Sequence, residues 1–337
     1  MSARTHPART RSRQLAPRLA GALAAAVLGA SGPAYADPSK LAAPIAHNYG
    51  EQETARQTAM AGGLRALGNS TAAMFQNPAS MPETRAYHIE GVVQLMPEAA
   101  RHLYGGAVVD SMTSRLTGGF AFVGGFIDKD GLDRSLIDAR LALAYPLSER
   151  FFVGLGGRYA KIWERGLGEF GASKLSGGLV DPDGGRFPFV SAFTFDAGIT
   201  VKATESLHIA ALGQNLTHPG NALLPTMLGG GIGYGTNDFS IEADGLADFD
   251  SWGKTTGRFM AGGEYLVGDH FPLRLGYRYD QGAKLNWLSG GLGYLGREFS
   301  IEGSVRRSVS SPGGTMVVVS LAYFLESAGI GRGSDAE

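Results

Sequence analysis

Charged side chains at alternate positions of otherwise apolar segments are the residues of this sequence best placed to do chemistry. They carry both signs and fall on neighbouring segments: Glu90, Asp138, Arg140, Arg158, Asp196, Lys202, Glu242, Asp244, Glu264, Arg274, Arg278, Glu302 and Arg306. Opposite charges that face each other across a sheet stabilise it. We therefore favour a network of salt bridges, which would also hold Arg56 and Arg65 of a preceding segment, over a substrate pathway. A single dominant sign would have favoured an ion-selective pore.

Patterns that mark catalysis or metal binding are missing from the sequence. Its seven histidines include no HExxH motif and no close pair, which are the spacings that zinc sites use. It has no cysteine, and this excludes disulfides and thiolate chemistry. Nothing in the sequence singles out a serine, a histidine and an acidic residue as a catalytic triad. We therefore predict that the protein is not an enzyme and that it has no metal site or other cofactor.

Glycine-rich stretches suggest another chemistry, the binding of phosphate. Residues 229–235 (GGGIGYG) have suitable spacings, but that motif needs a helix directly afterwards, and Asn237 and another alternating segment follow instead. We therefore interpret these glycines as part of a strand, where glycine allows bends and close backbone approach. The pairs Gly118-Gly119 and Gly124-Gly125 either bend their strand or serve packing.

The elements that position these residues are predicted by a period of two. From Tyr87 onward, segments of about ten residues alternate apolar with small or polar side chains, as strands with two different faces do. In residues 271–280, for example, Leu275 and Tyr277 alternate with Arg274 and Arg278. We count about fourteen such segments, near 86–96, 103–110, 116–127, 135–145, 150–163, 190–202, 207–215, 226–236, 238–246, 257–267, 271–280, 285–295, 298–307 and 315–324.

The connections between these segments alternate in length. Every second one is short (111–115, 146–149, 203–206, Asn237, 268–270 and 296–297), and the others are on the whole longer (97–102, 128–134, 164–189, 216–225, 247–256, 281–284 and 308–314). Outer-membrane barrels have tight periplasmic turns and longer outside loops, and strands of this length cross a bilayer when tilted. The sequence therefore predicts an all-β fold, a transmembrane antiparallel β-barrel of about 14 strands over residues 86–325, with an N-terminal lumenal plug.

The two ends of the chain are typical of export to an outer membrane. Residues 1–36 run from five arginines through an apolar stretch to Ala34-Tyr35-Ala36, which predicts a signal peptide cleaved after Ala36. Its loss removes five of the 30 basic residues and leaves 25 against 31 acidic ones, with no basic run that would follow a nucleic acid. We expect no nucleic-acid partner, a barrel surrounded by outer-membrane lipid and inserted by the barrel-assembly machinery, and a periplasmic tail at 326–337.

Residues 37–85 differ from the rest of the chain. Residues 51–67 are rich in alanine, with Met60, Leu64 and Leu67 at helix-compatible spacing, and turn-forming residues follow. The segment is too polar for lipid and too short to build a core of its own. We therefore expect it inside the barrel as a plug.

This plug resembles the N-terminal hatch of the FadL/TodX family of outer-membrane channels for hydrophobic compounds. Residues 61–68 (AGGLRALG) and 72–79 (AAMFQNPA) carry the likeness, and Asn77-Pro78-Ala79 is its most specific element. The wider superfamily, which includes PorV-like barrels, is resembled by residues 212–216 (LGQNL), 263–265 (GEY) and 275–278 (LGYR). The resemblance implies a barrel of fourteen strands, in agreement with the independent count, and passive uptake of small hydrophobic molecules.

The outer loops depart from the pattern of family members that move long-chain fatty acids, which have larger loops with apolar helices. Only 164–189 is long here, and it is rich in glycine and charge. We predict a channel for a small hydrophobic ligand of the fatty-acid or aromatic-hydrocarbon type. The alternatives are a PorV-like scaffold or carrier in protein export, a structural outer-membrane protein, and a barrel enzyme. The expected ligand contacts are Met60, Leu64, Met74, Phe75, Leu223, Leu224 and Met227.

Overall fold

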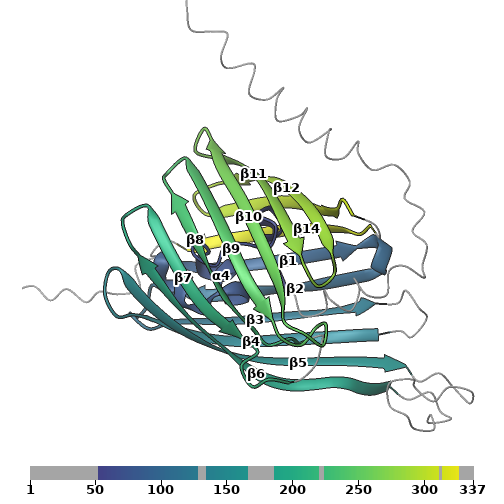
Figure 1. The fold of residues 1–337 in the computed structure, drawn as a ribbon. Helices are drawn as coiled ribbons and strands as arrows, with labels where there is room; N and C mark the ends of the chain where they lie inside the picture. The colour runs from purple at the N-terminus through teal and green to yellow at the C-terminus, as the bar shows by residue number, and fades with distance from the viewer. Residues whose placement is uncertain (1–51, 128–133, 166–185, 220–223, 311–312, 326–337) are drawn as a thin grey trace, which may run out of the picture. The chain divides into compact units, whose positions relative to one another are not determined.

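Fourteen antiparallel strands dominate the computed structural model, which describes residues 52–127, 134–165, 186–219, 224–310 and 313–325 of the 337-residue chain (Figure 1). The expected signal peptide (1–36), the first part of the expected plug (37–51) and the expected tail (326–337) lie outside these residues. The strands are β1 (Tyr87–Met96), β2 (Arg101–Asp110), β3 (Thr117–Ile127), β4 (Arg134–Pro146), β5 (Phe151–Arg165), β6 (Arg186–Lys202), β7 (Leu207–Gln214), β8 (Met227–Gly235), β9 (Phe239–Asp248), β10 (Thr256–Val267), β11 (Phe271–Asp280), β12 (Leu285–Leu295), β13 (Phe299–Ser308) and β14 (Thr315–Leu325).

These strands close into a barrel. Each pairs with its neighbours in sequence, and β14 returns to β1, so that Tyr87 lies opposite Leu325. Closure leaves no unpaired sheet edge. The predicted closed all-β barrel and its strand count are confirmed.

The sheet has two different faces, because successive side chains of a strand point to opposite sides. On β9, Phe239 and Ile241 are exposed, whereas Glu242 and Asp244 are buried. Every strand carries at least one exposed large apolar side chain, for example Ile89, Tyr104, Phe120, Leu141, Leu155, Phe193, Ile209, Ile232, Ile241, Phe259, Leu275, Leu288, Ile301 and Leu321. An apolar exterior around a charged interior is the arrangement of a barrel that has lipid as its outer solvent.

The connections gather at two ends of the barrel. The turn end carries 111–116, 147–150, 203–206, 236–238, 268–270 and 296–298. Among the described residues, the loop end carries 97–100, with the short helix η3 (Pro97–Ala99), 215–219, 224–226, 249–255, 281–284, 309–310 and 313–314. The tight turn at 268–270 places Gly268 and Asp269 at φ 60° and 63°, a left-handed conformation that these residue types tolerate. β5 and β6 extend beyond the predicted strands, to Arg165 and from Arg186. A register shift between Ile162 and Trp163 interrupts the alternation there, so the period of two does not predict the extension.

Residues 52–86, here called the inner segment, are enclosed by the barrel wall. They contain α3 (Ala55–Ala59), α4 (Ser70–Gln76) and η2 (Pro78–Glu83). A capping box between Thr54 and Gln57 starts α3, and Pro78 starts η2, where its missing N–H is not needed. α3 contacts β11 to β14, α4 contacts β1 to β3, and η2 contacts β4 to β6. None of these helices, nor any other among the described residues, is long and apolar enough to cross a membrane.

Candidate functional site

An apolar cluster lines one side of the lumen. It combines inward side chains of β2 to β6 with residues of the inner segment and with Leu224 of the β7–β8 connection. The cluster extends from Ile127 at the loop end to Val109 and Ala144 at the turn end. The members are Ala73, Met74, Phe75, Met81, Leu103, Ala107, Val109, Ala121, Val123, Ile127, Leu136, Ala142, Ala144, Ala160, Ile162, Val190 and Leu224. This set is called the apolar wall below.

Paired charges line the opposite side of the lumen, from β9 to β13. Arg258 of β10 binds Asp248 of β9 and lies 3.4 Å from Asp280 of β11. Arg274 of β11 binds Glu264 of β10 and, at 2.5 Å, Glu302 of β13. Buried charges need such partners, because an unpaired charge out of water is costly.

The thirteen lumen charges predicted from the sequence lie on strands of the barrel, and ten of them are buried. On β1, Glu90 accepts a 2.5 Å hydrogen bond from Thr71 of the inner segment. The buried ones are Glu90, Asp138, Arg140, Arg158, Asp196, Glu242, Asp244, Arg274, Arg278 and Arg306, and the half-buried ones are Lys202, Glu264 and Glu302.

A second charged network centres on Asp138 of β4. Its carboxylate accepts hydrogen bonds from Arg140, at 2.8 Å, and from Arg158 of β5. Arg140 also donates to the backbone oxygen of Phe75 at 3.2 Å, and its guanidinium lies 5.3 Å from the centre of the Phe75 ring. Arg158 donates to Oδ1 of Asn215 at 3.3 Å. The network thereby joins the wall to the inner segment and to the β7–β8 connection.

Arg56 of α3 makes the contact with the wall that the sequence predicts. Its guanidinium donates two hydrogen bonds of 3.1 Å to the Glu264 carboxylate of β10. Burial lowers the pKa of Arg56, but the neighbouring Glu264 carboxylate more than offsets this and the pKa is raised. Since Arg274 binds the same carboxylate, one acidic side chain ties the inner segment to two strands.

Arg65 is the second predicted anchor. Two carboxylates of β9 bind its side chain and the backbone of the next two residues. Arg65 donates to Asp244 at 3.2 Å. Two residues away, Glu242 accepts the backbone N–H groups of Ala66 and Leu67 at 2.7 and 2.8 Å. Charge-assisted bonds of this kind are stronger than those between neutral groups, so the loop between α3 and α4 is held firmly.

Asn77-Pro78-Ala79, the most specific element of the resemblance, lies against β5 and β6. Nδ2 of Asn77 donates to the backbone oxygen of Arg65 and to Oγ1 of Thr200, both at 2.9 Å. A Cβ atom at Gly154 would collide with the Pro78–Ala79 backbone, and one at Gly198 with the Asn77 side chain. The motif fits there because the wall has no side chains at these two positions.

Other glycines of the wall also make room for the inner segment. A Cβ at Gly119 of β3 would collide with the Met74 sulfur, and one at Gly233 of β8 with Leu67. β3 keeps its register with β2 and β4 along its whole length. Of the two interpretations of Gly119, the structure therefore supports packing rather than a bend. Residues 229–235 form strand β8 and no phosphate-binding loop.

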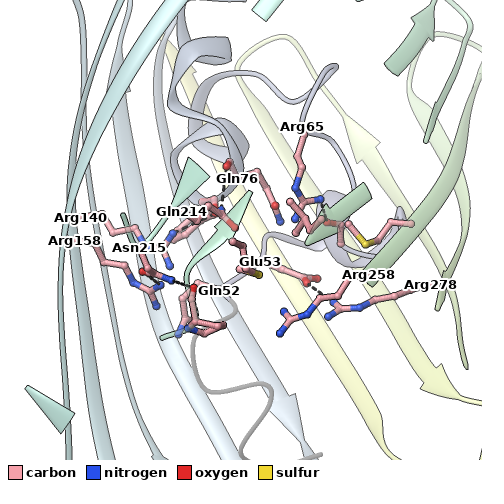
Figure 2. A pocket seen from close by; sticks show the side chains of 16 residues that line it. Gln52, Glu53, Arg65, Gln76, Arg140, Arg158, Gln214, Asn215, Arg258 and Arg278 are labelled. Atoms are coloured by element: carbon pink, nitrogen blue, oxygen red, sulfur yellow. Dashed lines mark hydrogen bonds and ion pairs between the residues drawn. The ribbon is translucent and has the colours of Figure 1, made fainter. Parts of the chain in front are cut away.

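A cavity lies between the inner segment and the wall, with about 570 Å³ of empty space, part of it open to solvent (Figure 2). Figure 2 shows Arg140 and Arg158 on one side, Arg258 and Arg278 on the other, and Glu53 between them. The lining residues are Gln52, Glu53, Gly62, Arg65, Phe75, Gln76, Arg140, Arg158, Gln214, Asn215, Pro225, Met227, Leu246, Arg258, Met260 and Arg278.

The apolar side chains predicted to contact a ligand are distributed over several places. Some belong to the apolar wall or line the cavity, namely Met74, Phe75, Leu224 and Met227. Met60 and Leu64 are buried within the packing of the inner segment, where Met60 lies against Gly262 of β10. Leu223 lies outside the described residues.

The sequence-based prediction leaves out several charges of the lumen. Arg258, Asp248 and Asp280 follow the same alternation as the predicted ones, so the period of two could have identified them. Glu53 lies outside every predicted strand, and only the fold of the inner segment brings it to 2.9 Å from Arg306. In the part of the chain that the structure describes, no group of three or more acidic or histidine side chains is arranged to hold a metal ion.

A closed barrel with an apolar exterior, a charged lumen and an enclosed N-terminal segment defines a class of protein, the transmembrane β-barrel with an occupied lumen. The fold is similar to that of the CymD monoaromatic hydrocarbon channel, with a TM-score of 0.60 and 15% identity over 82% of this chain and 97% of that chain. It is similar also to the Ralstonia pickettii toluene transporter TbuX (TM-score 0.56, 16% identity, 81% and 98% covered) and to a Pseudomonas aeruginosa FadL homologue (0.55, 15%, 80% and 98%). The predicted likeness to FadL/TodX barrels is thus confirmed for the fold. No protein-family model and no curated protein matches the chain.

Proposed function

We propose that the protein is an outer-membrane channel for the passive uptake of small hydrophobic molecules, of the fatty-acid or aromatic-hydrocarbon type, and not an enzyme. The apolar wall carries this proposal, because it reaches from Ile127 at the loop end to Val109 and Ala144 at the turn end. Contact with it would replace water around an apolar solute, at about 25 cal/mol for each Å² removed from water. Two of the similar structures are named as a hydrocarbon channel and a toluene transporter, which supports the same class of cargo.

The inner segment has the contacts expected of a plug. We infer that residues 37–85 are the plug, between a signal peptide (1–36) cleaved after Ala36 and a barrel (86–325) with a periplasmic tail (326–337). Arg56 and Arg65 bind carboxylates of β9 and β10, whereas Met74, Phe75 and Met81 rest on the apolar wall. Movement of these three side chains would open a path along the wall. Lipid, the ligand and the barrel-assembly machinery are the partners that this proposal requires, and nucleic acid is not among them.

Uptake by living cells tests the proposal. A Gram-negative host that lacks a channel of this kind would produce the chain, and entry of radiolabelled toluene and oleate would be compared with that in cells carrying an empty plasmid. We expect faster entry of at least one of them. Equal entry, with the folded barrel shown to be in the outer membrane, would contradict the proposal.

A pair of matched variants locates the path. Ala142→Gln adds a polar side chain to the apolar wall on β4, and Ser304→Gln adds the same side chain on β13, on the opposite side of the lumen. We expect the first variant to slow uptake more than the second. An equal effect of both would argue against a path along the apolar wall.

A further inference from the structure

The carboxyl end of α4 is capped by side chains of the barrel wall. The last carbonyl groups of a helix have no hydrogen-bond donor within the helix. Here Nη1 of Arg140 on β4 donates to the backbone oxygen of Phe75 at 3.2 Å. Nε2 of Gln214 on β7 donates to the backbone oxygen of Gln76 at 3.1 Å. A cation also suits the negative end of the helix dipole, so the last turn of α4 is held from outside by two strands.

Arg140 and Phe75 depend on each other's position. Nε and Nη2 of Arg140 donate to the Asp138 carboxylate at 2.8 and 3.4 Å, so each of its three nitrogens has an acceptor. Both side chains are buried, and the centre of the Phe75 ring lies 5.3 Å from the guanidinium. If Phe75 moved, Nη1 would remain buried without its acceptor, which is costly. Arg140 therefore stabilises the observed position of Phe75.

Asp138 connects this cap to the β7–β8 connection. Its carboxylate also accepts a 2.8 Å hydrogen bond from Nε of Arg158, and Nη1 of Arg158 donates to Oδ1 of Asn215 at 3.3 Å. The side chain of Asn215 in turn donates to the backbone oxygen of Pro225 at 2.8 Å. Gln214, the second cap, precedes Asn215 in the chain, and Figure 2 shows both beside the residues that they contact. Both caps of α4 are thus tied to one segment.

Leu224 places this segment in contact with the apolar wall. Of the members of the wall, it alone belongs to a connection between strands, and the others lie on strands or in the inner segment. It is buried and directly precedes Pro225. Ile127 and Ile162 of the same wall lie toward the loop end of β3 and β5. An apolar solute that enters along the wall from this end can therefore displace Leu224, whose neighbour in the chain holds Asn215.

We propose that the β7–β8 connection senses the solute and releases the last turn of α4. Contact of an apolar solute with Leu224 moves Asn215 and Gln214, which weakens both caps of α4, and Phe75 then leaves the apolar wall. The inference rests on the proposed channel and adds the regulation of its path.

The other contacts of the inner segment limit this movement. Arg65 stays bound to β9 and Asn77 to Thr200, so the loop before α4 and the motif after it remain on the wall. A ligand shifts such an equilibrium only by the difference between its affinities for the two states. The apolar surfaces of Phe75 and Leu224 pack into the wall in the observed state. They provide that difference once the solute can reach them.

Labelling of a single cysteine tests this inference. The chain contains no cysteine, so Ala73→Cys places one thiol on α4, at a position that is fully buried in the apolar wall. Reaction of the purified full-length barrel with a maleimide would be timed without a solute, with toluene and with oleate. We expect slow labelling without a solute and severalfold faster labelling with at least one of the two. Equal rates under all three conditions would overturn the inference.

Two substitutions added to Ala73→Cys locate the coupling. Gln214→Leu removes the second cap, and we expect about fivefold faster labelling without a solute, the factor that corresponds to the loss of one hydrogen bond. Leu224→Ala removes the contact with the solute, so labelling should remain slow when the solute is added. The matched controls are Gln94→Leu, whose amide contacts β14 rather than α4, and Leu285→Ala, buried at the loop end of β12 outside the apolar wall. Both should label as Ala73→Cys alone does.

Two results with these variants would contradict the coupling. Labelling of the Gln214→Leu variant at the rate of Ala73→Cys alone would overturn the inference, and so would an undiminished solute response of the Leu224→Ala variant. If Leu224→Ala does not fold, Asn215→Gly decides, because it removes the side chain that links Pro225 to the caps and keeps the backbone conformation. An undiminished solute response of that variant would overturn the inference in the same way.

The cell assay separates this inference from the proposed function, because labelling does not require transport. Uptake of toluene or oleate by cells that produce the chain, together with a solute response that does not need Leu224, would overturn the inference and leave the channel standing. A solute response that needs Leu224, together with no uptake of either compound, would overturn the channel and leave the coupling between Leu224 and α4 standing.

Discussion

Arg56 of the inner segment and Glu264 of β10 lie 3.1 Å apart, although 208 residues separate them in the sequence. The contact is part of a chain of alternating charges, because Glu264 also binds Arg274, and Arg274 binds Glu302 of β13. Glu264 thus serves two cations, whereas Arg56 has Glu264 as its ion-pair partner. The two ends of this ion pair should therefore differ in their importance for stability.

Glu264→Gln is predicted to destabilise the barrel more than Arg56→Gln does. The first change takes the shared carboxylate from two guanidinium groups, of which Arg274 keeps Glu302, and the loss of one partner of an ion pair that lies largely out of water is strongly destabilising. The second leaves Glu264 with Arg274. Urea unfolding of both purified variants, followed by tryptophan fluorescence, measures the difference. An equal loss, or the reverse order, would show that the shared carboxylate is not the centre of this network.

The double variant Glu242→Ala, Asp244→Ala is predicted to make the barrel leaky. It removes the acceptors of the Arg65 guanidinium and of the N–H groups of Ala66 and Leu67, and so frees the loop between α3 and α4. We expect cells that produce the variant to become more sensitive to vancomycin, which an intact outer membrane excludes. Glu205→Gln, in the exposed 203–206 turn, is the control. Unchanged sensitivity of the double variant would argue against a plug held by β9.

Gly233→Val is predicted to strain the packing of the inner segment, because its Cβ would collide with Leu67. Overpacking of this kind costs typically 1–3 kcal/mol. Gly303→Val on β13 is the matched control, since a Cβ there meets nothing within 4 Å. Thermal unfolding should show a lower midpoint for the first variant alone, and Leu67→Ala should restore part of it. Without that rescue, the loss would have a cause other than the contact with Leu67.

The barrel could be predicted from the sequence because lipid outside and a polar lumen inside impose a period of two on every strand. The same rule identified inward charges such as Asp138 and Arg274, whose positions alternate with apolar ones. The alternation does not identify partners. That Arg56 binds Glu264 rather than another carboxylate depends on strand register and on the course of the inner segment.

The cavity could not be predicted, for a related reason. Gln52 and Glu53 precede the first helix and have no periodic signal. Both line the cavity, and Glu53 reaches Arg306 and Arg278, only because the inner segment folds back through the lumen. The places where the wall must be glycine are equally hidden. In the sequence, Gly198 is an ordinary strand glycine, and only the structure shows that Asn77 packs against it.

Asn215 lies in the β7–β8 connection beside the cavity, and its substitution should lower stability. Its backbone has φ 54°, its N–H donates to Asp196 at 2.7 Å, and its side chain donates to the Pro225 oxygen at 2.8 Å and accepts from Arg158. Asn215→Gly keeps the left-handed conformation and loses the side-chain bonds, each of which stabilises by about 1 kcal/mol. Asn215→Ala loses the same bonds and adds a left-handed strain of about 1–2 kcal/mol.

The order of stability should therefore be wild type, then Asn215→Gly, then Asn215→Ala, as measured by urea unfolding. If Asn215→Gly were as stable as the wild type, the bonds of the side chain to Pro225 and Arg158 would contribute little to stability, and the backbone N–H bond to Asp196 would remain as the contact that holds Asn215.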